Sequence, residues 1–152
     1  MMAMEVAKHM ETEKVIVISS AKIYTEIPVY YRLAGRLRLH TLLPMRLLKS
    51  SNGITNWLFG AHSREEKQLL KQILLDTDPV FLKWAIDKIV RWTHSAPPRH
   101  TFHIHGTSDR ILPLKYVACD VKIQNGGHLM ILDKAEALTH ILRQQCSEIL
   151  LP

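Results

Sequence analysis

The chain has 152 residues, of which 47% are apolar, and its mean hydropathy is −0.03. This suits one globular domain with a sizeable core. No apolar run approaches the roughly 20 residues that a membrane-spanning helix needs, and the first residues lack the pattern of a signal peptide. Cys119 and Cys146 show neither metal-binding nor redox spacing, so we expect reduced thiols in a cytoplasmic protein.

The net charge of +6 comes partly from one segment, "YYRLAGRLRLHTLLPMRLLK" at 30–49. Its basic residues are Arg32, Arg36, Arg38, Arg46 and Lys49. Arg32 and Arg36 are four residues apart and would share one face of an amphipathic helix. Such a segment could contact an anionic lipid surface, RNA or an acidic protein. We favour a solvated helix face and expect no nucleic acid partner, because aromatic and basic residues do not alternate there.

The N-terminal part predicts a helix followed by a strand. Residues 1–10 form the helix, because Met2, Val6 and Met10 make an apolar stripe at intervals of four. "KVIVISS" at 14–20 is an unbroken run rich in β-branched residues. This pattern is typical of a parallel strand that is buried on both faces.

A long helical section is predicted from about Thr25 to Trp92. Ser63, with Glu66 three residues later, makes a capping box at the start of one helix. Asp78 followed by Pro79 supplies an N-cap and a first-turn proline for another. "SAPPRH" at 95–100 then ends the helical section, because consecutive prolines cannot continue a helix.

The C-terminal part predicts two more strands and a helix. "TFHIHG" (101–106) alternates apolar residues with His103 and His105, and "DVKIQNGG" (120–127) is the third strand. The last helix begins near Leu132. Its buried stripe is Leu138, Ile141, Leu142 and Ile149. This order of elements predicts an α/β fold with about three parallel strands and flanking helices.

Two loop residues are candidates for proton-transfer chemistry. In "NGGH" two glycines, which lack side-chain bulk and allow positive φ, precede His128. Asp109 follows the 101–106 strand, and ligand sites in α/β sheets lie beyond the carboxyl ends of strands. His128 could instead be an ordinary loop histidine, and Asp109 an Asx-turn residue. We favour the pair, in which the carboxylate orients the imidazole and stabilises its protonated form.

These two stretches resemble the C-terminal part of an α/β-hydrolase fold enzyme. "HIHGTSDRILP" contains the pattern H-G-x-x-D-x-x-x-P, and "NGGH" places a histidine in a G-G-H turn before the last helix. The resemblance implies that Asp109 is the acid and His128 the general base of a catalytic triad. It also implies a partial hydrolase core, residues 1–23 and 95–152, with a helical cap inserted at 24–94.

The nucleophile of that family is missing from the chain. No G-x-S-x-G turn, nor an aspartate or cysteine equivalent, occurs in the sequence. Ser19 and Ser20 end a strand without flanking glycines, and Ser108 lies beside the acid in the wrong turn. We therefore expect the nucleophile upstream of Met1. A fragment, a split gene, an internal start or a pseudo-enzyme would each give this sequence.

The sequence gives weaker support for a functional role of the other histidines and of the aromatic residues. His100, His103 and His105 could form a metal site, but no carboxylate or cysteine has matching spacing, so we assign neither a metal nor a cofactor. Six aromatic residues of the helical section could line an apolar pocket, although helix packing explains most of them: Tyr30, Tyr31, Trp57, Phe59, Trp84 and Trp92.

The resulting hypothesis is the C-terminal portion of a hydrolase that cleaves esters or related bonds in a small, apolar substrate. The alternative is a non-catalytic interaction module that uses the basic helical segment. If the hydrolase hypothesis holds, the 14–20 strand lacks one neighbour. No charge or proline protects the edge between Val15 and Ser20. We therefore expect self-association through this edge, or a complementary N-terminal half as partner.

Overall fold

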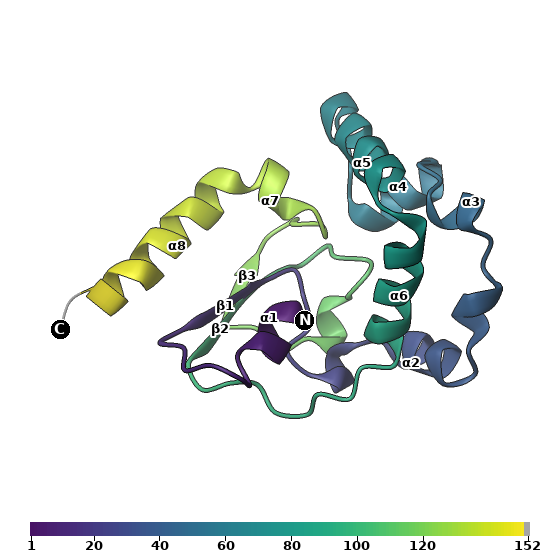
Figure 1. Cartoon of the computed structure of the whole chain (residues 1–152). Helices are drawn as coiled ribbons and strands as arrows, with labels where there is room; N and C mark the ends of the chain where they lie inside the picture. The colour runs from purple at the N-terminus through teal and green to yellow at the C-terminus, as the bar shows by residue number, and fades with distance from the viewer. Residues whose placement is uncertain (151–152) are drawn as a thin grey trace.

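A computed structural model describes residues 1–150, and of residues 148–150 it describes the backbone only (Figure 1). The strands are β1 (Val15–Ile18), β2 (Thr101–Gly106) and β3 (Val121–Ile123). The α-helices are α1 (Met2–Val6), α2 (Val29–Arg36), α3 (Met45–Leu48), α4 (Gly53–Phe59), α5 (Arg64–Asp76), α6 (Pro79–Val90), α7 (Met130–Asp133) and α8 (Ala135–Leu150). Three short 3-10 helices are η1 (Tyr24–Glu26), η2 (Leu39–Leu42) and η3 (Leu114–Tyr116).

The three strands form one parallel sheet in the order β1-β2-β3. Val15 pairs with Thr101 at the start of β1, and Ile104 pairs with Val121 at the start of β3. The predicted α/β arrangement with three parallel strands is therefore confirmed. β3 is shorter than the predicted 120–127 strand.

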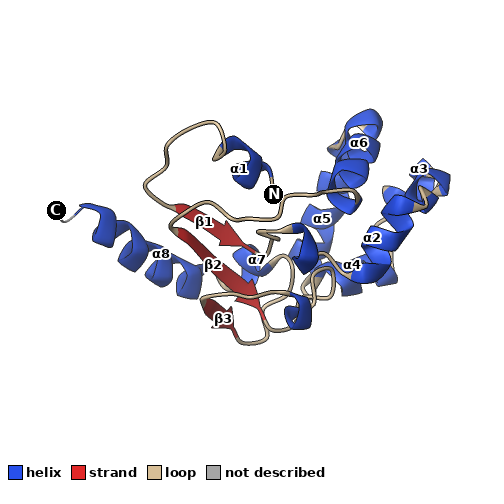
Figure 2. Ribbon diagram, turned by 90° about the horizontal axis from the view of Figure 1, so that it is seen from below, coloured by secondary structure: helices blue, strands red, loops and turns tan. Residues whose placement is uncertain are grey.

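The alternation of side chains along the strands produces two apolar layers. On one face Ile104 and Ile123 pack with Met130 and Leu138, so that α7 and α8 cover this side (Figure 2). On the other face Val15 and Val17 pack against Met4 of α1. Both faces of β1 are thus covered, as its unbroken apolar sequence predicted.

The helical section lies beside the carboxyl end of the sheet, on the side away from α8 (Figure 1). The predicted capping box is present, since the Ser63 side chain accepts from the Glu66 amide and the Glu66 side chain accepts from the Ser63 amide. Asp78 caps α6 by accepting from the Phe81 amide at 2.8 Å, and Pro79 is the first helical residue. Local sequence therefore placed both helix starts correctly.

Three predictions about the terminal helices are corrected. The first helix ends at Val6 instead of residue 10, and Met2, Val6 and Met10 are all exposed. Met4 is the fully buried residue, because it faces β1. The last helix is interrupted at Lys134, with α7 before it and α8 after it.

The predicted stripe of the last helix is present where it can be assessed. Leu138 is buried, and Ile141 and Leu142 pack against the same cluster. The side chain of Ile149 lies outside the described residues.

β1 lies at an edge of the sheet. The Val15 amide donates to the carbonyl of His100, the residue before β2, at 3.2 Å. The Ser19 amide donates to the carbonyl of Ile104 in β2 at 3.1 Å. The amides of Ile16 and Ile18 therefore point the other way, where no strand of residues 1–150 pairs with them. No helix within residues 1–150 is long and apolar enough to cross a bilayer.

Candidate functional site

Asp109 and His128 meet at the carboxyl edge of the sheet. Asp109 follows the end of β2, and His128 follows the end of β3. Because these strands are parallel neighbours, their outgoing loops leave from the same edge. The His128 Nδ1 lies 2.8 Å from the Asp109 Oδ2, so the structure contains the predicted contact.

Glycines allow the two loops to approach each other. A Cβ on Gly106 would collide with the carbonyl of Gly126, and one on Gly126 would lie 3.1 Å from the Gly106 Cα. The Ser108 amide donates to the Gly126 carbonyl at 2.9 Å. Positive φ, the other property expected of the two turn glycines, is found instead at Asn125, with φ 57°. Close contact is therefore what requires glycine here.

The Asp109 carboxylate is fully buried and uses both oxygens. Oδ1 accepts from the amides of Ile111 and Leu112, each at 2.9 Å. This is the Asx-turn arrangement that was the alternative to a site. Oδ2 accepts from His128. Asp109 thus shapes its own loop and orients the imidazole at the same time.

The geometry fixes which ring nitrogen of His128 carries a proton. A carboxylate accepts, so the neutral ring has its hydrogen on Nδ1 and a lone pair on Nε2. The side chain is 23% exposed, and the Phe59 ring stands edge-on to it at 5.8 Å between centroids. No side chain among residues 1–147 hydrogen-bonds the His128 Nε2. This nitrogen is available to accept a proton.

His105 stabilises the Asp109 loop from a buried position on β2. Its fully buried ring places Nε2 2.8 Å from the Leu112 carbonyl and 3.7 Å from Asp109 Oδ2. Leu112 also donates its amide to Asp109, so both the carbonyl and the amide of Leu112 are hydrogen-bonded. The sequence placed His105 in the H-G pattern and among the possible metal ligands, but did not predict this contact. Its inward position on a buried strand was the available signal.

The end of α4 packs against the two loops. The Leu129 amide donates to the Phe59 carbonyl at 3.1 Å, and a Cβ on Gly60 would lie 3.1 Å from the Gly127 Cα. Arg110 Nη1 donates to the Trp57 carbonyl at 2.9 Å, and its guanidinium stacks over the Trp57 ring at 4.7 Å. The helical section therefore contacts the candidate site directly.

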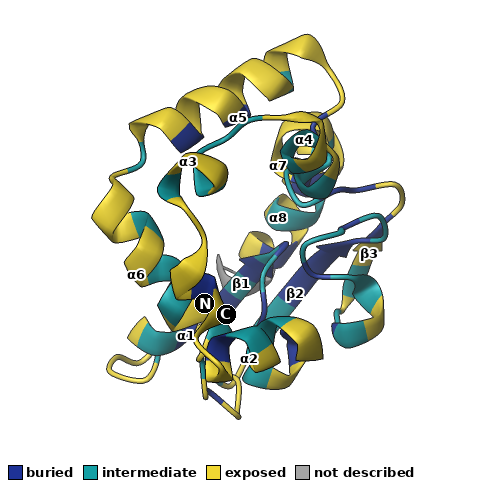
Figure 3. Cartoon of the chain, turned by 90° about the vertical axis from the view of Figure 1, so that its right-hand side faces the viewer, coloured by how far each residue is buried: buried dark blue, intermediate teal, exposed yellow. Residues whose placement is uncertain are grey.

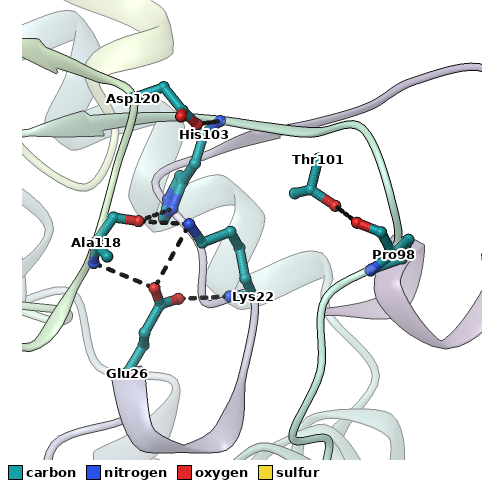
Figure 4. Close-up of polar contacts among 7 residues, drawn as sticks. All are labelled: Lys22, Glu26, Pro98, Thr101, His103, Ala118 and Asp120. Carbon is teal, nitrogen blue, oxygen red and sulfur yellow. Dashed lines mark hydrogen bonds and ion pairs between the residues drawn. The ribbon is translucent and has the colours of Figure 1, made fainter.

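His103 is part of a buried polar cluster (Figure 4). Its Nδ1 lies 3.3 Å from the Ala118 carbonyl, to which Lys22 Nζ also donates, and its Nε2 has no protein partner. Burial, reinforced by the charges of His105 and Lys22, lowers the pKa of His103 to about 4. The imidazole is therefore neutral at physiological pH.

Of the three histidines considered as metal ligands, the fold separates His100 from the other two. His103 and His105 share the face of β2 that lies opposite Ile104, with ring centroids 5.3 Å apart. His100 is exposed at the amino end of that strand. In the part of the chain that the structure describes, no three His, Cys, Asp or Glu side chains gather as a metal site.

The hydroxyl groups discussed as nucleophiles do not contact His128. Ser19 is buried, has φ 47°, and its Oγ has no protein partner. Ser20 Oγ accepts from the Met1 amino group at 3.1 Å. Within the described residues, no hydroxyl or thiol completes a triad with Asp109 and His128.

The aromatic residues differ from the packing prediction. Tyr30, Trp57 and Trp84 are exposed by 50%, 57% and 45%, so packing covers only about half of each of these side chains. A cavity of about 710 Å³ lies between α1 and α6 and is lined partly by Trp84 and Trp92. Neither Asp109 nor His128 lines this cavity.

Comparisons with known proteins do not identify a relative. No family model, no curated protein and no solved structure matches the chain. The interpretation of the site therefore depends on its own geometry.

Proposed function

We propose that Asp109 and His128 are the acid and general base of an α/β-hydrolase-type active site that cleaves an ester or a related bond. The observation that carries this proposal is the 2.8 Å contact between a fully buried carboxylate and a partly exposed imidazole. The turn bonds of Asp109 occupy only its Oδ1 atom. Here the second oxygen orients a ring whose Nε2 has no partner among the described side chains.

In this proposal His128 Nε2 removes the proton from a nucleophile as that group attacks the substrate carbonyl. The same nitrogen then returns the proton to the leaving group. Asp109 keeps the ring in the Nδ1–H form and stabilises the imidazolium. The Ile111 and Leu112 amides hold the carboxylate in place, so that little reorganisation accompanies the proton transfer.

The nucleophile in this proposal comes from a segment other than residues 1–150. The free edge of β1 supports this, because a further parallel strand paired there would end at the same edge of the sheet as β2 and β3. Residues 24–94 act as a cap that shields a small, apolar substrate from water. The contact of Phe59 and Gly60 with the His128 loop supports that role.

The test measures hydrolysis of a p-nitrophenyl ester by two proteins. The first is the 152-residue chain alone, and the second is the product translated with the coding sequence upstream of codon 1. We expect no difference between the chain alone and its His128→Ala variant. In the longer product, His128→Ala should reduce turnover greatly, since loss of the equivalent base in subtilisin costs on the order of a million-fold.

His140→Ala is the matched control, because His140 is an exposed histidine on α8. It should leave turnover unchanged. An upstream sequence that encodes no strand followed by a nucleophile turn would contradict the proposal. His128-dependent turnover by the chain alone would place the nucleophile within these residues and contradict its assignment to another segment.

A further inference from the structure

The surface of α2, η2 and α3 combines positive charge with exposed leucines. No acidic residue occurs between Glu26 and Glu65, whereas this interval contains six arginines and lysines: Arg32, Arg36, Arg38, Arg46, Lys49 and Arg64. Arg36, Arg38 and Arg46 are exposed. The local charge is therefore of one sign.

The apolar face of α2 points outward. Gly35 lies against α6, because a Cβ there would meet Val90 at 2.5–2.8 Å. The opposite side of the helix carries Val29, Leu33 and Leu37, which are exposed by 55%, 54% and 59%. A surface helix normally buries such a stripe. Here the stripe has no covering element among the described residues.

The same combination continues along the chain. Leu39 and Leu42 of η2 are exposed by 48% and 76%, and Leu47 of α3 by 55%. α2, η2 and α3 lie along the border of the molecule farthest from α8 (Figure 1). Seen from that side, much of the ribbon of the helical section is exposed (Figure 3). We call the outward surfaces of residues 29–48 the leucine–arginine face.

We propose that the leucine–arginine face binds the surface of an anionic phospholipid bilayer. Exposed leucines would enter the boundary between headgroups and acyl chains, while the arginines contact lipid phosphates. Long arginine side chains can reach the headgroups from a helix that lies in the interface. Asp87 of the neighbouring α6 does not oppose this, because it pairs with Arg91 at 3.3 Å and with His40 at 3.1 Å.

Charge and the exposed leucines together favour a lipid surface over a second copy of the chain and over RNA. A second copy packed symmetrically on this face would bring two sets of arginines together, with repulsion across the interface. RNA would satisfy the arginines but leave the exposed leucines in water, since few aromatic side chains are available for base stacking. An anionic bilayer offers phosphates to the arginines and an apolar environment to the leucines.

The test is co-sedimentation of the chain with vesicles made of equal parts phosphatidylglycerol and phosphatidylcholine. Binding should weaken as salt is added and should be absent with pure phosphatidylcholine vesicles. Arg36→Gln and Arg38→Gln should each lower the partition coefficient by roughly fivefold. The double variant Leu37→Gln, Leu42→Gln should also reduce binding. All these side chains are exposed, so the fold should be retained.

Arg143→Gln and Ile131→Gln are the matched controls, since these exposed residues lie on α8 and α7, away from the face. They should leave binding unchanged, and circular dichroism should be the same for every variant. Absence of vesicle binding at low salt, or binding that the face variants do not alter, would overturn the proposal. So would self-association or RNA binding that depends on these variants without vesicle binding.

Discussion

The carboxylate of Asp109 holds the His128 ring through one oxygen while the other oxygen closes its own turn. Oδ2 lies 2.8 Å from His128 Nδ1, and Oδ1 receives the Ile111 and Leu112 amides at 2.9 Å. The two alternatives offered by the sequence, a turn residue and a histidine partner, are thus compatible. Because the turn bonds fix the carboxylate, the orientation of the imidazole follows from the loop.

This arrangement predicts that Asp109→Asn reverses the tautomer of His128. The two amide donors would keep the asparagine oxygen in the Oδ1 position, so its NH₂ group would face His128 Nδ1. That nitrogen would then have to accept, and the ring proton would move to Nε2. NMR of the ring nitrogens at mildly alkaline pH, where imidazoles are neutral, measures this directly. His140 should show no change, and an unaltered His128 tautomer would contradict the geometry.

A second prediction concerns the contact between Gly106 and Gly126. Gly106→Ala should reduce the free energy of unfolding by about 1–3 kcal/mol, because the added methyl group forces the two loops apart. The same change should weaken the Asp109–His128 hydrogen bond. Urea unfolding measures the first effect, and the NMR signal of the His128 ring measures the second.

Gly53→Ala is the control for that experiment. A Cβ at Gly53 meets nothing within 4 Å, and the residue begins α4. We expect an unchanged or slightly increased stability, by up to about 1 kcal/mol. Equal destabilisation by both substitutions would mean that close packing is not the reason for glycine at 106.

A third prediction follows from the lowered pKa of His103. Burial favours the neutral ring, with a pKa of about 4 in the folded chain against 6.5 for the ordinary group. Protonation therefore favours the unfolded state. The contribution of His103 is fully present above about pH 6.5 and is lost as the pH falls toward 4, by up to about 3 kcal/mol.

Urea unfolding of the wild type and of His103→Gln at several pH values tests this effect. Carboxylates also titrate in this range, so the quantity of interest is the difference between the two pH profiles. The wild type should lose more stability than the variant between neutral and acidic pH. Parallel profiles would show that His103 does not carry the effect.

A fourth prediction concerns the free edge of β1. The amides of Val17 and Ser19 point toward β2, whereas those of Ile16 and Ile18 point away from it. In dilute solution we expect hydrogen exchange to be faster at Ile16 and Ile18 than at Val17. No charge or proline protects this edge, so raising the concentration should cause self-association and protect both isoleucine amides.

Sedimentation and exchange, measured on the same samples, check that prediction. Val17 is an internal control, because its protection should not depend on concentration. A monomer at all accessible concentrations, with Ile16 and Ile18 as protected as Val17, would show that the edge is covered. A polypeptide that supplies a paired strand should protect these two amides in the same way.

Several features were predictable because they depend on neighbours in the sequence. The unbroken apolar run at 15–18 indicated a strand buried on both faces, and Ser63 with Glu66 indicated the start of α5. Periodicity and turn chemistry act over a few residues, so the sequence alone determined these two elements. The adjacency of Asp109 and His128 was expected for another reason, because neighbouring parallel strands deliver their loops to one edge of the sheet.

Other features were decided by contacts between distant segments. Met4 is buried instead of Met2, Val6 and Met10 because α1 meets Val15 and Val17 with that side. The periodicity of a short helix does not show which side a strand will cover.

The candidate site also combines features that the sequence predicted with features that only the tertiary structure showed. Sequence placed Asp109 and His128 at one edge of the sheet, but only the tertiary structure showed that Gly106 and Gly126 are in contact and that His105 supports Leu112. The outward-facing leucines of α2 were equally unpredictable, since their pattern is that of a buried stripe. Local propensity determines which elements form, whereas the packing of those elements determines which atoms meet.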